Sequence, residues 1–205
     1  IGGKTGVDFY HYKNLIGAFH MPKLVYSSMH CLLSLPKVQY ASGMGEIIKH
    51  ALIHNEKYLP YLLEHKEALQ ERNPEILLET IYQSNRIKKY FVEKDPYEHG
   101  DRKFLNFGHS LGHAIEKVAL SLCKNIAKED ILKVQELMED MGLETRCKAL
   151  KHEDIFEALS KDKKQKNQHL QFVLLHQLCS PYIEEDISKE RIEEVLKQYM
   201  RSEEV

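Results

Sequence analysis

The stretch "NPEILLETIYQSNRIKKYFVEK", residues 73–94, carries a long helical pattern with a clear beginning. Asn73 suits the N-cap, where a side-chain oxygen accepts hydrogen bonds from the first free N–H groups. Pro74 suits the first helical position, because the N–H that proline lacks would have no partner there. The stretch therefore predicts a helix that starts at Pro74 and runs to about Lys94.

Helical patterns also lie on both sides of this stretch. The polar segment 95–102 predicts a loop, and further helices are expected over 42–53, 56–72, 106–118, 127–143, 152–164 and 188–200, the last capped by Ser188. Strands are expected only over 23–28 and, as a hairpin, within 169–186, while the glycine-dotted residues 1–22 are expected to be irregular. The sequence predicts a mainly α domain with a few short strands.

Composition excludes several classes of protein. The 29 basic and 31 acidic residues are balanced, which argues against a general nucleic-acid binder. Four cysteines without a CxxC pair are typical of reduced thiols in a cytoplasmic protein. No apolar run approaches the ~20 residues that a membrane helix needs. Because the chain opens on Ile1 without Met or a signal peptide, we expect a fragment that lacks an N-terminal part.

Two histidines, His109 and His113, lie four residues apart on one face of the helix expected over 106–118. They could be metal ligands, an acid–base pair or surface groups. Glu46, on the helix expected over 42–53, would suit a zinc site together with His109, but zinc usually takes three protein ligands. The order differs from HExxH, and with 12 histidines chance pairs such as His50 and His54 are expected. The pattern alone favours solvated or core histidines.

Basic and amide side chains form a second set of candidates. Each alone is typical of a solvated surface group, yet together they could hold a carboxylate or a phosphate. The set comprises Lys4, Asn14, Lys88, Arg102, Asn106, Lys163 and Lys164. The "GGKTG" segment at residues 2–6 is not a Walker loop, but its backbone N–H groups could approach an anion.

Four segments resemble 3-dehydroquinate synthases in identity and order: "GGKTG" (2–6), "GMGEIIK" (43–49), "NFGHSLGHAIE" (106–116) and "KDKK" (161–164). The first three are specific to that family and its sugar-phosphate cyclase relatives, and the resemblance covers nearly the whole chain. It implies that residues 1–22 are a remnant of the N-terminal domain and that residues 23–205 form the helical metal- and substrate-binding domain. The N-terminal α/β domain, with most of the NAD site, would be absent.

The resemblance implies a carbon–oxygen lyase of the shikimate pathway, which leads to chorismate and the aromatic amino acids. Such enzymes convert 3-deoxy-arabino-heptulosonate 7-phosphate to 3-dehydroquinate and release phosphate, using NAD and zinc or cobalt. They oxidise a hydroxyl, eliminate phosphate, reduce the ketone and close the ring by an aldol step. The expected partner is therefore a small phosphorylated sugar acid, with no nucleic acid and no membrane. The sequence leaves the oligomeric state open, with a homodimer as one possibility.

The resemblance also implies a role for each matched residue. Glu46 and His109 match metal ligands, and His113 matches a histidine that acts in proton transfer. Lys49 and Arg102 match the other catalytic positions, and Lys4 a position that also serves the cofactor. Substrate contacts are matched by Lys4, Asn14, Lys88, Asn106, Lys163 and Lys164, and a supporting or orienting role by Asp95 and Glu98.

The sequence departs from the family in two places. An HGEAV segment, which carries the third metal ligand in the family, is missing after the histidine helix, and Asn125 stands near the place of its histidine. We expect a break in the chain between Val118 and Ala119, where residues are left out of the sequence; the alternative is a true deletion. Asp8 stands where the family usually has Asn.

Three other functions compete with this one. A related cyclase would act on a sugar phosphate without a carboxylate, but the cations Arg102 and Lys88 favour an acidic substrate. A non-catalytic helical fragment would account for the missing third ligand. An unrelated zinc hydrolase is disfavoured by the absence of HExxH.

Overall fold

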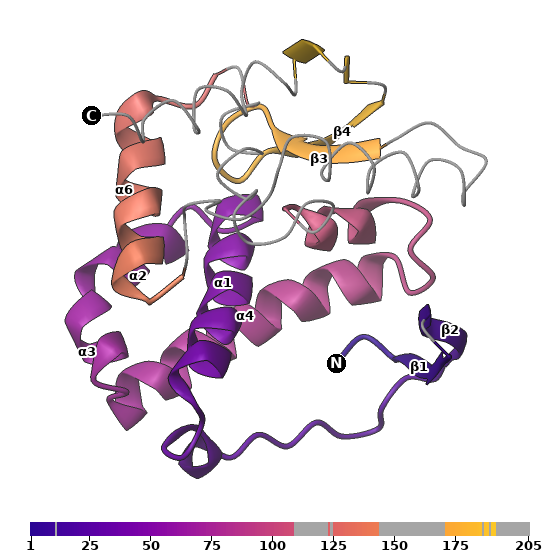
Figure 1. The fold of residues 1–205 in the computed structure, drawn as a ribbon, viewed down its shortest axis with the longest axis horizontal. Helices are drawn as coiled ribbons and strands as arrows, with labels where there is room; N and C mark the ends of the chain where they lie inside the picture. The colour runs from indigo at the N-terminus through magenta and orange to yellow at the C-terminus, as the bar shows by residue number, and fades with distance from the viewer. Residues whose placement is uncertain are drawn as a thin grey trace.

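A computed structural model describes residues 1–10, 12–108, 123, 125–143, 171–185, 187–188 and 190–191, without the side chains of 12–15 and 171. The described fold is mainly α, as predicted, with two separate two-stranded antiparallel sheets (Figure 1). No helix in this described part is both long enough and apolar enough to cross a membrane.

Two crossing helices form the centre of the molecule, α1 (Lys37–Ile53) and α4 (Pro74–Lys94) (Figure 1). Apolar side chains such as Ile48 and Leu52 of α1 and Ile87 of α4 are almost completely buried in one core. Burying a large aliphatic side chain stabilises the fold by about 1.5–3 kcal/mol, so these residues fix how the two helices cross.

Three shorter helices extend this core: α2 (Tyr58–Glu64), α3 (Lys66–Gln70) and α6 (Lys128–Asp140). They lie together at one end of the molecule (Figure 1). Their apolar faces point inward, and the Lys66 ammonium on α3 bonds to the Asp140 carboxylate of α6 at 2.9 Å. The predicted helix over 56–72 is therefore two helices, which meet at His65.

Local hydrogen bonds confirm both predicted caps. The Asn73 side-chain oxygen accepts from the backbone N–H groups of Glu75 and Ile76 at 3.1 and 3.2 Å. The Ser188 hydroxyl accepts from the Arg191 N–H at 3.3 Å. The start of α1 was predicted less well, because the helix begins at Lys37 rather than at Ser42.

The predicted C-terminal hairpin is also confirmed, as β3 (Gln171–Leu175) paired with β4 (Pro181–Glu185). It contacts the short 3-10 helix η2 (Asp101–Asn106), so residues far apart in sequence support the same turn. Another 3-10 helix, η1 (Met29–Leu32), precedes α1. Asn106 thus ends η2 and does not begin a longer helix; the remainder of the helix predicted over 106–118 lies outside the described residues beyond Gly108.

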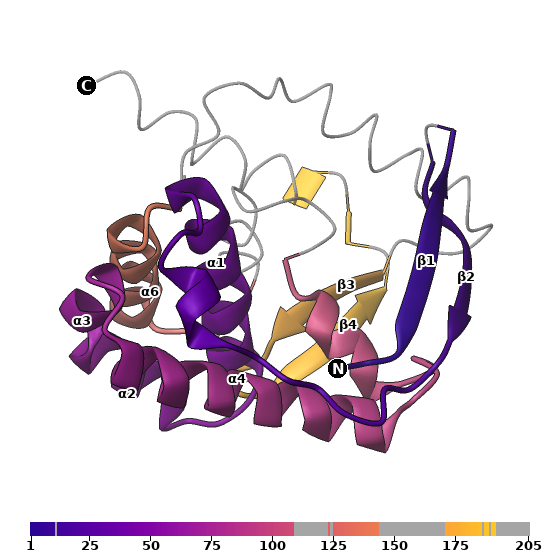
Figure 2. The same cartoon turned by 90° about the horizontal axis from the view of Figure 1, so that it is seen from below.

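The prediction of an irregular segment over residues 1–22 is wrong, because this segment contains the hairpin β1 (Lys4–Phe9) and β2 (Tyr12–Phe19). Glycines suggested irregular backbone, yet here they allow close strand pairing. Gly6 faces Gly17, and a Cβ on Gly17 would lie 2.5 Å from the Thr5 carbonyl oxygen. The hairpin stands at one end of the molecule (Figure 2).

The strand predicted over 23–28 is not formed among the described residues. The segment runs extended beside α4 (Figure 2) without pairing to a described strand. Leu24 and Tyr26 are 82% and 84% exposed. An alternating pattern favours extended backbone, but a strand also needs a neighbouring backbone to bond with, and the described fold offers none here.

Candidate functional site

A polar cavity of about 250 Å³ lies where the start of the chain meets α1, α4 and η2. Its walls bring together five predicted site residues that are separated by up to 102 positions in the sequence. They are Lys4, Glu46, Lys88, Arg102 and Asn106. The remaining lining residues are Ile1, Gly2, His50, Glu98 and Leu105.

Helix α1 supplies a carboxylate and two bases to this region. Glu46 lines the cavity, and its Oε1 bonds to the Nζ of Lys49 at 2.6 Å, one helical turn away. Lys49 is only 1% exposed. A carboxylate beside a buried ammonium offsets part of the cost of burying its charge. The Nδ1 of His50, in turn, lies 2.7 Å from the Ser84 hydroxyl on α4.

A compact turn between α4 and η2 carries the next group of side chains. The Asp95 carboxylate accepts hydrogen bonds from the backbone N–H groups of His99, Gly100 and Arg102 at 3.0, 2.7 and 3.2 Å. Desolvation acts to raise the pKa of Asp95, but these N–H donors outweigh it and hold the pKa below the ordinary value. The Asp95 carboxylate therefore organises the turn, which is consistent with the supporting role predicted for it.

Arg102 joins this turn to the start of the chain. It is 4% exposed, and its guanidinium donates one hydrogen bond to the Pro96 carbonyl and another to the Gly2 carbonyl. It makes no ion pair with a described carboxylate, and it lies over the Phe19 ring. A guanidinium fork can hold two carbonyl groups at once, so Arg102 clamps both segments around the cavity.

Glu98 sits at the centre of the charged groups. Its carboxylate forms an ion pair with Lys4 and accepts a hydrogen bond from the Asn106 amide at 2.8 Å. Desolvation and then the positive charges of Arg102 and Lys88 lower the pKa of Lys4. The cavity is lined by three cations, Lys4, Lys88 and Arg102, and by the carboxylates of Glu46 and Glu98, so its formal charge is positive and favours an anion.

The donor set fits a divalent metal in part. Glu46 offers a carboxylate oxygen at the cavity wall, which is a suitable ligand for zinc or cobalt. Among the described residues, no three His, Cys, Asp or Glu side chains are placed to hold a metal ion together. A metal at this position would therefore need ligands from the part of the chain beyond Gly108, where the predicted partner His109 falls.

Several predicted site residues lie outside the part of the chain that the structure describes. These are His109, His113, Lys163 and Lys164, while Asn14 falls on β2 with its side chain not described. Conversely, His50 lines the cavity although the sequence assigned it no site role. His50 could have been found from the sequence, because it follows Glu46 by four residues and shares its helix face.

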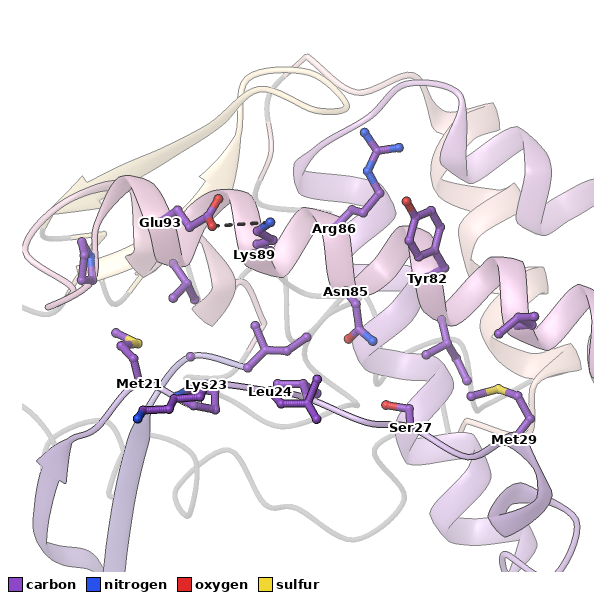
Figure 3. Close-up of a pocket in the computed structure, with 18 residues that line it drawn as sticks. Met21, Lys23, Leu24, Ser27, Met29, Tyr82, Asn85, Arg86, Lys89 and Glu93 are labelled. Atoms are coloured by element: carbon purple, nitrogen blue, oxygen red, sulfur yellow. Dashed lines mark ion pairs between the residues drawn. The ribbon is translucent and has the colours of Figure 1, made fainter.

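A larger cavity of about 840 Å³ lies between the extended segment 21–29 and α4 (Figure 3). Asn85 points from α4 toward the extended segment, whereas Arg86 points away from it, and Lys89 pairs with Glu93 along the helix (Figure 3). The walls are mostly apolar, and none of the predicted site residues lines them. The smaller, charged cavity is therefore the candidate site.

Two solved structures share the fold of this chain. 2-epi-5-epi-valiolone synthase from Streptomyces hygroscopicus subsp. jinggangensis, solved with NAD+ and Zn2+ bound, is 20% identical with a TM-score of 0.87 over 99% of this chain and 62% of its own. 2-deoxy-scyllo-inosose synthase, complexed with carbaglucose-6-phosphate, NAD+ and Co2+, is 22% identical with a TM-score of 0.78 over 97% and 62%. The chain therefore has the fold of a sugar-phosphate cyclase.

Sequence relatives narrow this class to one family. Residues 1–42 match the family described as 3-dehydroquinate synthase N-terminal, and residues 43–124 match 3-dehydroquinate synthase C-terminal. The 3-dehydroquinate synthase of Dehalococcoides mccartyi (strain ATCC BAA-2266) is 35% identical over 221 residues. That of Prochlorococcus marinus (strain MIT 9515) is 36% identical over 197 residues, 85% of this chain and 54% of the relative. The chain belongs to the 3-dehydroquinate synthase family.

The match to these relatives covers nearly all of this chain but only part of each relative. It covers 97% of this chain but 61% of the Dehalococcoides protein, so the chain spans about three fifths of that relative's length. The 221 matched residues outnumber the 205 of this chain, so the relative has residues without a counterpart here. The predicted break after Val118, where an HGEAV segment would belong, remains a prediction, as does the domain division at residue 22.

Proposed function

We propose that this chain forms the substrate- and metal-binding part of a 3-dehydroquinate synthase, which converts 3-deoxy-arabino-heptulosonate 7-phosphate to 3-dehydroquinate and phosphate. The observation that carries the proposal is the convergence of five family-matched residues on one charged cavity: Lys4, Glu46, Lys88, Arg102 and Asn106. They come from the first strand, two helices and a 3-10 helix, and no feature of local sequence would bring them together.

The charges in the cavity suit a substrate with two anionic groups. Lys88 makes no ion pair with a described residue, so its ammonium can meet a phosphate or a carboxylate of the ligand. Arg102 holds its wall in place through the carbonyls of Pro96 and Gly2. Lys4 and Asn106 supply further donors, which in this structure bond to Glu98. Donors fixed in this way orient the substrate before reaction and lower the entropic part of the barrier.

The two cofactors of the family would supply the chemistry that side chains cannot. Bound NAD would accept and return a hydride, and a bound divalent metal would polarise substrate oxygens. We propose that Glu46 and His109 hold the metal and that Lys4 reaches the cofactor. Lys49, which bonds to Glu46, would hold a proton near a substrate hydroxyl, and His113 would move one.

Turnover tests this proposal, with the chain joined to the amino-terminal portion of the Dehalococcoides relative that precedes the match. With NAD and zinc, this protein should release phosphate from 3-deoxy-arabino-heptulosonate 7-phosphate and form 3-dehydroquinate. Glucose 6-phosphate, which has no carboxylate, should not react. Turnover of glucose 6-phosphate instead would favour a related cyclase, and zinc-loaded protein inactive on both would favour a non-catalytic fragment.

A further inference from the structure

Glu98 occupies the groups that are expected to bind the substrate. Its Oε2 pairs with the ammonium of Lys4, and its Oε1 accepts from the amide of Asn106. Both partners match substrate contacts of the family, and all three side chains line the same cavity. A carboxylate of the protein is therefore bound where a carboxylate or phosphate of a ligand would bind.

The backbone around Glu98 directs this carboxylate inward. Glu98 has φ of 62°, in the left-handed region that a non-glycine residue adopts only at a cost. The turn is held on its other side by Asp95, which accepts from the N–H groups of His99 and Gly100. The Glu98 side chain is 19% exposed, so it is held within the cavity wall rather than in solvent.

The positive charges around Glu98 give its carboxylate a physical role. Lys4, Lys88 and Arg102 repel one another, and desolvation adds to the cost of keeping them charged. A carboxylate among them relieves that repulsion. It also means that an incoming anion must displace Glu98 from Lys4 and Asn106, and the free energy of this displacement is the same for every anion.

We propose that Glu98 is an internal competitor for the anion site, which weakens the binding of all anions by the same factor. The proposal rests on the proposed function, in that the cavity must bind the anionic substrate. The alternative is that Glu98 is a purely structural tether, which joins β1 to η2 through Lys4 and Asn106. Removal of a tether would weaken binding or leave it unchanged, whereas removal of a competitor strengthens it.

The binding of inorganic phosphate and of acetate to the full 205-residue chain, measured by calorimetry, tests this. Glu98→Gln keeps an oxygen that can accept from Asn106 but removes the charge. We expect its Kd for phosphate to fall about tenfold, the size of effect that a charge-assisted contact produces. Acetate should gain by the same factor as phosphate, because the free energy of displacing Glu98 does not depend on the anion. Glu136→Gln, which removes an exposed carboxylate that pairs with Lys66 on the far side of the core, is the matched control and should bind like the wild type.

Lys88→Gln separates this proposal from the proposed function. If Lys88→Gln weakens phosphate binding while Glu98→Gln leaves it equal or weaker, the cavity is the anion site and Glu98 is no competitor. If neither substitution changes phosphate binding, the cavity is not the anion site and both proposals fail. Thermal unfolding of each variant shows whether a loss of binding is only a loss of fold; a folded Glu98→Gln that binds phosphate more weakly overturns the competitor.

Discussion

At the scale of single residues, the candidate site depends on side chains that bond to backbone. Arg102 could have been a simple anion ligand, yet its guanidinium holds two carbonyl groups from segments nearly a hundred residues apart. Asp95 holds three backbone N–H groups of one turn. Such residues set the positions of the cavity walls, so their replacement should affect stability as well as binding.

Arg102→Lys should destabilise the protein although it keeps the positive charge. A lysine ammonium cannot bond to the Pro96 and Gly2 carbonyls in the forked geometry of a guanidinium. The lost hydrogen bond should lower the free energy of unfolding by about 2 kcal/mol, the order expected for a bond to a charged group. Urea unfolding measures this. Arg86→Lys, on the exposed face of α4, is the control and should change the midpoint little; equal losses in both variants would contradict the clamp.

Asp95 should make the stability depend on pH in the acid range. Because its pKa is lower in the folded protein than in the unfolded chain, the ionised carboxylate stabilises the fold above the ordinary Asp pKa. That contribution is lost as the pH falls through the folded pKa. Urea midpoints between pH 7 and pH 2.5 should therefore fall more for the wild type than for Asp95→Asn, which has no such titration. Parallel curves for the two proteins would show that the turn does not depend on this charge.

At the scale of secondary structure, the local signals in the sequence predicted the helices better than the strands, of which only the C-terminal hairpin was predicted. The start of α4 followed from Asn73 and Pro74, because a cap is a contact within four residues. The β1–β2 hairpin was missed since its glycines resemble those of a loop until their pairing is seen. The strand expected over 23–28 failed for the opposite reason, because its pattern specifies a conformation and no partner.

Asn73 should contribute measurably to the stability of α4. Asn73→Ala removes the acceptor for the N–H groups of Glu75 and Ile76, and the free energy of unfolding should fall by about 1 kcal/mol. Asn73→Asp keeps an acceptor and should stay near the wild type. Chemical denaturation compares the three proteins. If Asp is as destabilising as Ala at this position, the side-chain cap is not what stabilises the helix.

Much of the site could be predicted only by resemblance. The family motifs nominated Lys4, Glu46, Lys88, Arg102 and Asn106, and the fold brings them to one cavity. The motifs gave no sign that Arg102 clamps two carbonyls or that Glu98 bonds to both Lys4 and Asn106, because these contacts depend on the path of the chain in three dimensions. His50 is the exception, since helical spacing from Glu46 would have placed it on the same face.

At the scale of the whole molecule, the candidate site lies where two parts of the chain meet. The segments that match the N-terminal and C-terminal families adjoin between residues 42 and 43, within α1. The cavity takes Ile1, Gly2 and Lys4 from the first and its other walls from the second. Its geometry therefore depends on how firmly the start of the chain is held against η2.

Gly2 should be essential for that attachment. Its φ is 98°, and a Cβ there would lie 3.1 Å from a guanidinium nitrogen of Arg102. Gly2→Ala should therefore weaken the Arg102 contact and lower the free energy of unfolding by about 1–2 kcal/mol, in line with left-handed strain in a non-glycine residue. Hydrogen exchange should show that Gly2→Ala speeds the exchange of the backbone amides in β1, relative to the wild type, more than it does in β3. Gly43→Ala, where an added Cβ meets nothing, is the control and should not have this effect.

The most direct test of the central claim, that this charged cavity binds the phosphorylated sugar acid, uses two neighbouring lysines of α4. Lys88 lines the candidate cavity, whereas Lys89 lines the larger apolar one and pairs with Glu93. The measurement is the Kd of the chain for 3-deoxy-arabino-heptulosonate 7-phosphate by calorimetry. Lys88→Gln should raise the Kd by about tenfold or more, the effect of a lost charge-assisted contact, and Lys89→Gln should leave it unchanged. Equal affinities in the two variants, or a larger loss in Lys89→Gln, would contradict the account.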